Sequence, residues 1–120
     1  MDEFTERKAL FDRGIDFYRE KKYDEALECF RRVAEESPNN HVIQHFLGLA
    51  KLRTGNASSA LVNLAFEEKL MQTSNLSPEK KASLQKHIIF SRALCFCVLE
   101  EFEKAAVILL EHLDKEIGDN

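Results

Sequence analysis

Two histidines are the residues of this 120-residue chain whose spacing comes closest to that of a metal site. His41 and His45 lie four residues apart, which places two imidazole rings on one face of a helix, as in many zinc sites. The segment HVIQH lacks the glutamate of the zinc-protease helix, however, and no third ligand is evident in the sequence. We therefore expect no metal site.

The cysteines suggest packing rather than chemistry. Cys95 and Cys97 form the sequence CFC, which is not the CxxC of a redox pair, and Cys29 makes the total odd, so no disulfide framework is indicated. We expect Cys95 to face a neighbouring helix as a small core residue and Cys97 to be exposed. The sequence also lacks a glycine-rich phosphate loop and a nucleophile elbow. We expect no catalytic residues, no cofactor and no enzyme activity.

Composition indicates an ordered domain of a protein that does not bind nucleic acid. Apolar residues make up 44% and charged residues 32% of the chain, and the acidic and basic residues are interspersed at a net charge of −4. The N-terminus is charged where a secretory signal would be apolar, and no stretch approaches the ~18 apolar residues of a membrane span. We expect one domain over residues 1–120 and a cytoplasmic location.

The spacing of the apolar residues predicts six helices and no strand. From Phe4 onward they recur every three or four residues, which makes a stripe along a helix. Asn40 and Ser77 are suited to cap helix starts, and Gly55 can adopt the left-handed conformation that ends a helix. The predicted helices begin near Phe4 and Tyr23 and then span about 41–53, 57–71, 78–99 and 102–116.

Small residues recur at a fixed interval and divide the helices into three pairs. The interval from Gly14 to Gly48 is the same as that from Ala26 to Ala60, and the shorter interval from Gly14 to Ala26 returns between positions 93 and 105. Small residues let paired helices approach closely. We expect aromatic side chains such as those at 30 and 102 to fill the gaps around them. The predicted repeats cover about 7–40, 41–74 and 86–118, with an insertion at about 72–85.

The first pair carries the strongest pattern, which resembles the tetratricopeptide repeat, a helix–turn–helix unit of roughly 34 residues. The second pair is degenerate and the third is intermediate. The resemblance implies an all-α solenoid of three antiparallel helix pairs, a right-handed superhelix. The family's signature residues match Leu10, Gly14, Phe17, Tyr23, Ala26, Phe30 and Pro38.

The resemblance also implies a concave groove, because the first helix of each pair lines such a surface in that family. Its apolar character here predicts that it binds a largely apolar peptide or helix, with Arg19 and Arg53 available for a carboxylate at its edge. Alternatively, the chain's own termini or a second copy fill it. This predicted groove consists of Phe11, Ile15, Tyr18, Arg19, His45, Leu49, Leu52, Arg53, His87, Phe90 and Leu94.

One well-known use of such a groove is not expected. A subset of the family clamps the acidic C-terminus of heat-shock chaperones with two Lys, two Asn and an Arg. A carboxylate clamp needs fixed cationic and amide donors, and none of the corresponding residues of this chain matches. Those residues are Phe11, Ile15, Phe46, His87 and Ser91.

Several functional classes remain open from the sequence. The first is an interaction module or adaptor that binds a protein or peptide partner. The second is a dedicated chaperone or assembly factor similar to type III secretion chaperones. The segment HFLGLAKLRTG of this chain resembles the second repeat of those chaperones in a general way. A homo-oligomeric scaffold and a regulatory fragment of a larger enzyme are further alternatives. The last predicted helix is apolar around much of its girth, which predicts a homodimer through the C-terminal helix pair.

Overall fold

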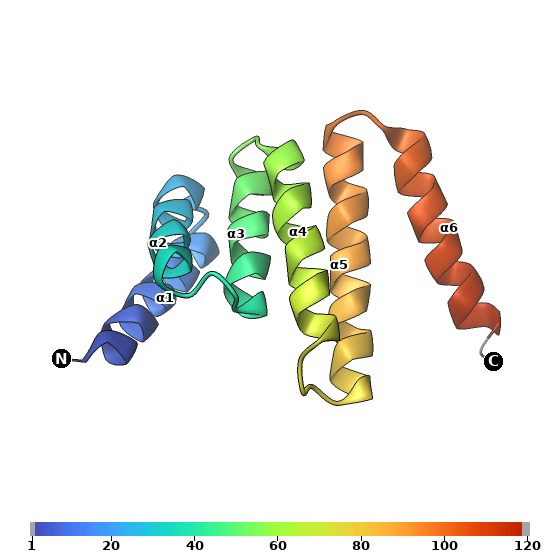
Figure 1. Ribbon diagram of the computed structural model, residues 1–120. Coiled ribbons are helices and arrows are strands. Elements are labelled where there is room, and N and C mark those ends of the chain that lie inside the picture. The colour runs from blue at the N-terminus through green and yellow to red at the C-terminus, as the bar shows by residue number, and fades with distance from the viewer. Residues whose placement is uncertain (1, 119–120) are drawn as a thin grey trace.

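The computed structural model describes residues 2–118, and these residues form six helices and no strand (Figure 1). All six predicted helices are confirmed, with ends that differ from the prediction by a residue or two. The predicted caps are confirmed too, since the side chains of Asn40 and Ser77 accept hydrogen bonds at the helix starts that follow them. The helices are α1 (Glu3–Arg19), α2 (Tyr23–Glu36), α3 (His41–Arg53), α4 (Ala57–Gln72), α5 (Pro78–Val98) and α6 (Phe102–Gly118).

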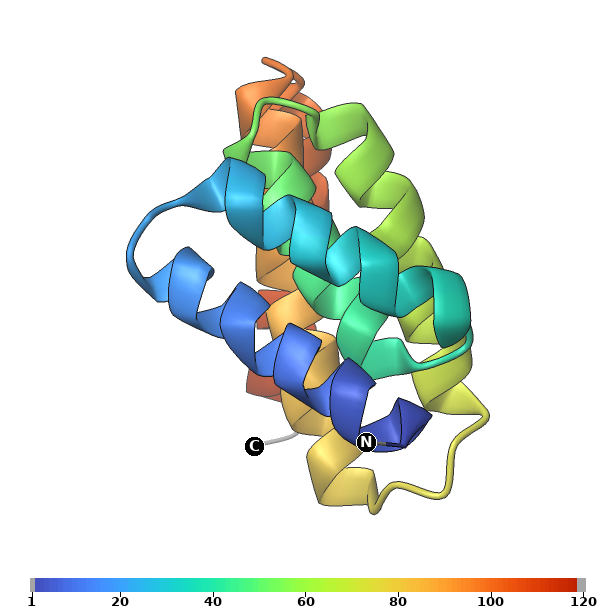
Figure 2. The ribbon, with the colours of Figure 1, turned by 90° about the vertical axis from the view of Figure 1, so that its left-hand side faces the viewer.

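The helices stack in chain order, and each contacts the next. They form an elongated body of 51 × 34 × 21 Å, with the two ends of the chain at opposite ends of the row (Figure 1). Figure 2 looks at this row from the α1–α2 end, where the two helices lie side by side in front of the others. The predicted solenoid of antiparallel helix pairs is therefore confirmed. Within the described residues, no helix is both long and apolar enough to span a bilayer.

The turn inside each pair has the same conformation three times. Lys21, Gly55 and Glu100 have positive φ angles of 63°, 89° and 61°. In each turn the next residue donates its backbone N–H to a carbonyl five residues earlier, which is the Schellman arrangement that ends a helix. These 2.8 Å bonds join Lys22 N to Phe17 O, Asn56 N to Lys51 O, and Glu101 N to Phe96 O.

Close approach of α1 and α2 depends on Gly14. A Cβ atom added there would lie 2.6 Å from Cε1 of Phe30, a side chain that is fully buried. Gly48 occupies the equivalent place in the second pair, but a Cβ atom there would be 3.4 Å from its nearest neighbours. Only the first pair therefore requires glycine.

The core is divided between neighbouring pairs rather than gathered at one centre. A first cluster joins α1, α2 and α3 around Phe30, and a second joins α3, α4 and α5 around Leu64 and Cys95. The expectation that Phe102 fills a gap is wrong, since this side chain is 62% exposed. Tyr23 holds the equivalent place in the first pair and packs edge-on against another tyrosine, whereas Phe102 has Cys97 at the corresponding position.

The two glycines provide a matched test of helix approach. We expect Gly14→Ala to lower the free energy of unfolding by about 1–3 kcal/mol, because the buried Phe30 ring cannot move aside. Gly48→Ala should be neutral or stabilising by up to ~1 kcal/mol, because alanine favours the helix. Urea unfolding followed by circular dichroism measures both. Equal losses in the two variants would contradict the assignment of the close contact to the first pair.

The turn residues provide a second test. Replacing Gly55 by Ala places a Cβ atom in the left-handed region and should cost about 1 kcal/mol, whereas Lys21→Gly should stabilise the protein by roughly 0.5–1 kcal/mol. Thermal unfolding of the two variants beside wild type gives the comparison. A destabilised Lys21→Gly variant would show that the lysine side chain, rather than its backbone conformation, determines the stability of that turn.

Candidate binding groove

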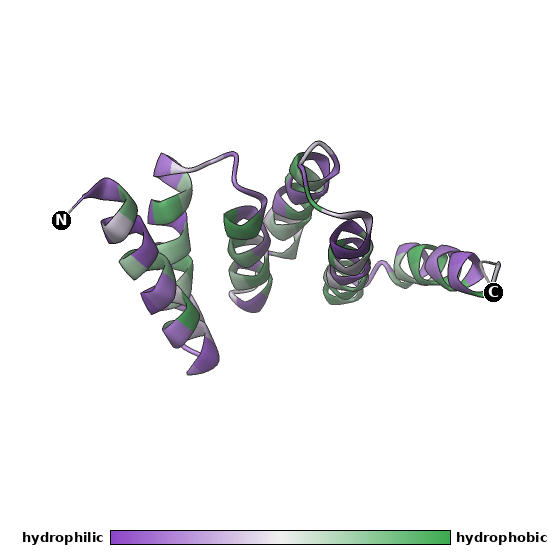
Figure 3. Cartoon of the chain, turned by 90° about the horizontal axis from the view of Figure 1, so that it is seen from below, coloured by the Kyte–Doolittle hydropathy of each residue, from purple (hydrophilic) through white to green (hydrophobic). Residues whose placement is uncertain are grey.

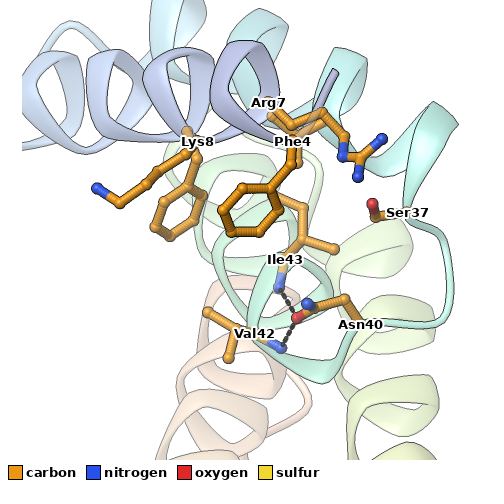
Figure 4. A pocket seen from close by; sticks show the side chains of 9 residues that line it. Phe4, Arg7, Lys8, Ser37, Asn40, Val42 and Ile43 are labelled. Carbon is orange, nitrogen blue, oxygen red and sulfur yellow. Dashed lines mark hydrogen bonds between the residues drawn. The ribbon is translucent and has the colours of Figure 1, made fainter. Parts of the chain in front are cut away.

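The start of α1 and the start of α3 form an apolar pocket of about 490 Å³, which we call the α1–α3 pocket (Figure 4). Phe4 and Lys8 of α1 lie on one side, and Val42 and Ile43 of α3 lie on the other. Phe11 of α1 also lines the pocket. Phe4 is 69% and Val42 is 41% exposed, so apolar side chains at the mouth are open to a partner. The remaining lining residues are Arg7, Val33, Ser37 and Asn40.

The sequence folds locally so that the walls of the pocket are fixed. Asn40 caps α3, its Oδ1 accepting hydrogen bonds from the backbone N–H groups of Val42 at 2.9 Å and Ile43 at 3.3 Å. On the α1 side, the ring of Phe11 packs edge-on against Phe46 with centroids 5.4 Å apart and also contacts Phe30 at 5.8 Å. The pocket is therefore anchored to the first core cluster.

The pocket is built for binding rather than for chemistry. Its charged groups are two cations at the edge: Arg7 forms an ion pair with Glu36 at 3.6 Å, and Lys8 one with Asp12 at 3.0 Å. The lining contains no carboxylate, histidine or cysteine. Such a surface can accept a bulky apolar side chain with an acidic group near the cations.

The middle of the predicted groove is less open than the sequence suggested. Phe11 lies in the α1–α3 pocket, but Ile15 and Tyr18 are half-buried against the first core cluster, and Leu49 is half-buried as well. Leu52 does not belong to the groove, because it is only 8% exposed and lies in the second core cluster. That cluster joins Leu52 to residues of α4 and to Cys95 of α5.

The two predicted edge arginines differ in how firmly they are held. Nε of Arg53 donates a 3.3 Å hydrogen bond to the hydroxyl of Tyr18, and its guanidinium lies 5.8 Å from the ring centroid of Tyr23. The bond to Tyr18 raises the pKa of Arg53. Arg19 is exposed. Arg53 is therefore the better-placed cation, held against the first pair by two tyrosines.

His45 is occupied by a neighbour rather than free for a ligand. Its Nδ1 lies 3.0 Å from Oε1 of Glu67, a carboxylate that is only 1% exposed. Its ring also packs edge-on against Phe46 at 5.4 Å. Within residues 2–118, no three His, Cys, Asp or Glu side chains are placed to hold a metal ion together. His45 is thus a partner for a buried charge at the junction of α3 and α4.

The residues predicted from the third pair lie apart from the α1–α3 pocket. His87 is exposed, and Phe90 and Leu94 are 50% and 45% exposed on α5. The ring of Phe90 packs edge-on against His112 of α6, with centroids 5.7 Å apart. The exposed apolar side chains of the predicted groove are therefore Phe90 and Leu94, both in the third pair.

Phe4 is one of the pocket residues that the sequence did not predict as part of the groove. It belongs to the same stripe as Lys8 and Phe11, since residues 4, 8 and 11 share one face of a helix. The repeat pattern begins at residue 7, so Phe4 lies outside the predicted repeat. The helical spacing of residues 4, 8 and 11 is the feature of the sequence that indicates Phe4 as a neighbour of Phe11.

The cysteines are placed as the sequence predicted. Cys95 is fully buried in the second core cluster and Cys97 is exposed. Burial raises the pKa of the Cys95 thiol, and also that of Cys29, which keeps both in the unreactive protonated form.

The pair formed by His45 and Glu67 gives a prediction about stability. Replacing His45 by Ala leaves the buried carboxylate without this partner and should lower the free energy of unfolding by about 3 kcal/mol. Glu67→Gln, which keeps a side chain able to accept a hydrogen bond from His45, should cost less. Urea unfolding at neutral pH compares the two. A His45→Ala cost below that of Glu67→Gln would contradict a structural role for the histidine.

Comparison with known protein families finds a match to the tetratricopeptide repeat over residues 7–40. A comparison with curated proteins finds no match to the chain. The matched segment comprises most of α1, all of α2 and the loop up to Asn40. It therefore contains most of the residues that line the α1–α3 pocket.

Proposed function

We propose that this chain is an adaptor that holds a segment of a partner protein along the first helices of its pairs, because residues 7–40 match the tetratricopeptide repeat and the described residues form a row of antiparallel helix pairs. The tetratricopeptide repeat is a protein-interaction family, which supports a partner-binding role. In this proposal, a bulky apolar side chain of the partner enters the α1–α3 pocket, and the segment continues toward Arg53.

The α1–α3 pocket is the observation that supports this proposal. Its volume of about 490 Å³ lies within the range of ligand sites, roughly 300–1,000 Å³, and its lining is mainly apolar. Phe4 and Val42 are open at its mouth, where burying them against a partner would remove apolar surface from water. A pocket held by a helix cap and a core aromatic needs little rearrangement to bind, which reduces the entropic cost.

The cations near the pocket indicate the charge of the partner segment. Arg7 and Lys8 flank the pocket and Arg53 is fixed by Tyr18 and Tyr23. A partner segment with acidic residues on either side of an apolar anchor would place carboxylates near these cations. We therefore propose an acidic segment with one aromatic or long aliphatic side chain at its centre.

A random-peptide phage library panned against the protein tests this proposal. We expect the enriched peptides to carry an aromatic or long aliphatic residue near acidic ones. Val42→Glu should weaken their binding by about tenfold or more, because it places a charge in the mouth of an apolar pocket. Fluorescence anisotropy of labelled peptides gives the affinities.

Val62→Glu is the matched control, since Val62 is 70% exposed on α4 and does not line the pocket. It should leave the affinity of the peptides unchanged, and both variants should keep wild-type helicity by circular dichroism. Peptides that bind Val42→Glu as tightly as wild type would overturn the assignment of the pocket.

A further inference from the structure

Exposed large apolar side chains are concentrated on the last helix pair. Figure 3 shows this pair at the C-terminal end of the row, with both hydrophobic and hydrophilic residues along α6. On α6 they form a stripe, because residues 102, 106, 110, 113 and 117 follow one another at intervals of four, four, three and four. All five are exposed. The open face of this pair, which we call the end face, consists of Phe90 and Leu94 of α5 together with Phe102, Ala106, Leu110, Leu113 and Ile117 of α6.

The first pair shows what covers an equivalent face. The first and third pairs are related by a constant shift in sequence position, which takes residue 14 to residue 93 and residue 26 to residue 105. The same shift takes Phe11 to Phe90 and Ile15 to Leu94. In the first pair both residues pack into the cluster that α3 completes, with Phe11 against Phe46. The end face therefore has the form of a seat for a helix that lies across α5 and α6.

The exposed side of α6 is more apolar than the equivalent side of α2 in the first pair. Leu110 is 59% and Ile117 is 63% exposed, whereas the same shift in position places Arg31 and Pro38 at the corresponding places of the first pair. These two side chains extend the apolar stripe to the outer side of α6. The described part of the chain thus supplies both a seat for a helix and a helix with an apolar stripe.

We infer that two copies of this chain pair through their end faces, with α6 of each copy lying across α5 and α6 of the other. Each α6 would then take the place that α3 takes on the first pair, and a two-fold axis would relate the copies. Each copy has six large side chains that leave roughly 100 Å² open apiece, so the two copies together would bury about 1,200 Å², the lower end of specific interfaces. Interfaces at this low end are typical of weak, transient complexes, so we expect pairing with micromolar affinity.

Charges beside the stripe determine how salt acts. Glu103 and Asp114 flank the apolar stripe on α6, and each copy has a net charge of −4. Like charges would therefore approach when the copies pair, and added salt screens such repulsion. Pairing through the end face should therefore strengthen as salt is added. Binding of acidic peptides near Arg7, Lys8 and Arg53 should instead weaken as salt is added.

Sedimentation equilibrium of the whole chain tests this inference. Wild type at about 100 µM, well above a micromolar dissociation constant, should have twice the 13.8 kDa mass of one chain. Leu110→Arg should be a monomer at the same concentration. The first pair carries an arginine at the equivalent position, so this substitution suits a helix of this fold.

Two variants serve as controls. Val107 is 53% exposed on α6 but lies in a different pocket, with Arg92 and Phe96, and the first pair has Glu28 at its place. Val107→Glu should therefore remain a dimer, and so should the groove variant Val42→Glu. A monomeric wild type, or equal loss of pairing in Leu110→Arg and Val107→Glu, would overturn the inference, while peptide binding at the α1–α3 pocket would be unaffected.

Discussion

A helix pair of this kind cannot bury both of its apolar faces by itself, and the rest of the structure follows from that constraint. Each pair is stabilised by its neighbour, so the core is divided into clusters that lie between pairs. The helices α3 and α4 in the middle are covered on both sides. Within residues 2–118, the last pair has a neighbour on one side only, and its side chains Phe90, Leu94 and Leu113 are about half exposed.

The same constraint separates the two proposed interaction surfaces. The α1–α3 pocket lies where two first helices meet, whereas the end face lies where the row stops. They share no residue, so a partner segment in the pocket and a second copy on the end face would be compatible. A dimer would present two pockets, and a partner with two matching segments would bind more tightly through effective concentration.

The sequence was sufficient for the helices and their pairing, because apolar spacing, caps and small residues are local signals. Gly55 was recognisable as a left-handed residue, but Lys21 and Glu100 adopt the same conformation without a glycine to indicate it. The turns there share the Schellman hydrogen bond and the positive φ angle of the turn at Gly55. The repeat interval, rather than the residue type, was the signal for these two positions.

The candidate site was harder to predict, because exposure depends on neighbours distant in sequence. Leu52 has the spacing of a groove residue, yet it is buried in the second core cluster with residues of α4 and α5. The pocket forms between the start of α1 and the start of α3, so Phe4 comes to lie beside Val42 only in the folded chain. His45 likewise had the spacing of a ligand, but its partner is a buried glutamate 22 residues away.

Amide hydrogen exchange measured at several protein concentrations tests most directly the claim that the uncovered end of the row is covered by a second copy. The account predicts that exchange slows with increasing concentration in α6 and in the adjoining part of α5, while the rates in α1 and α2 stay constant. Exchange rates in α6 that do not depend on concentration, or slowing spread evenly over all helices, would contradict it.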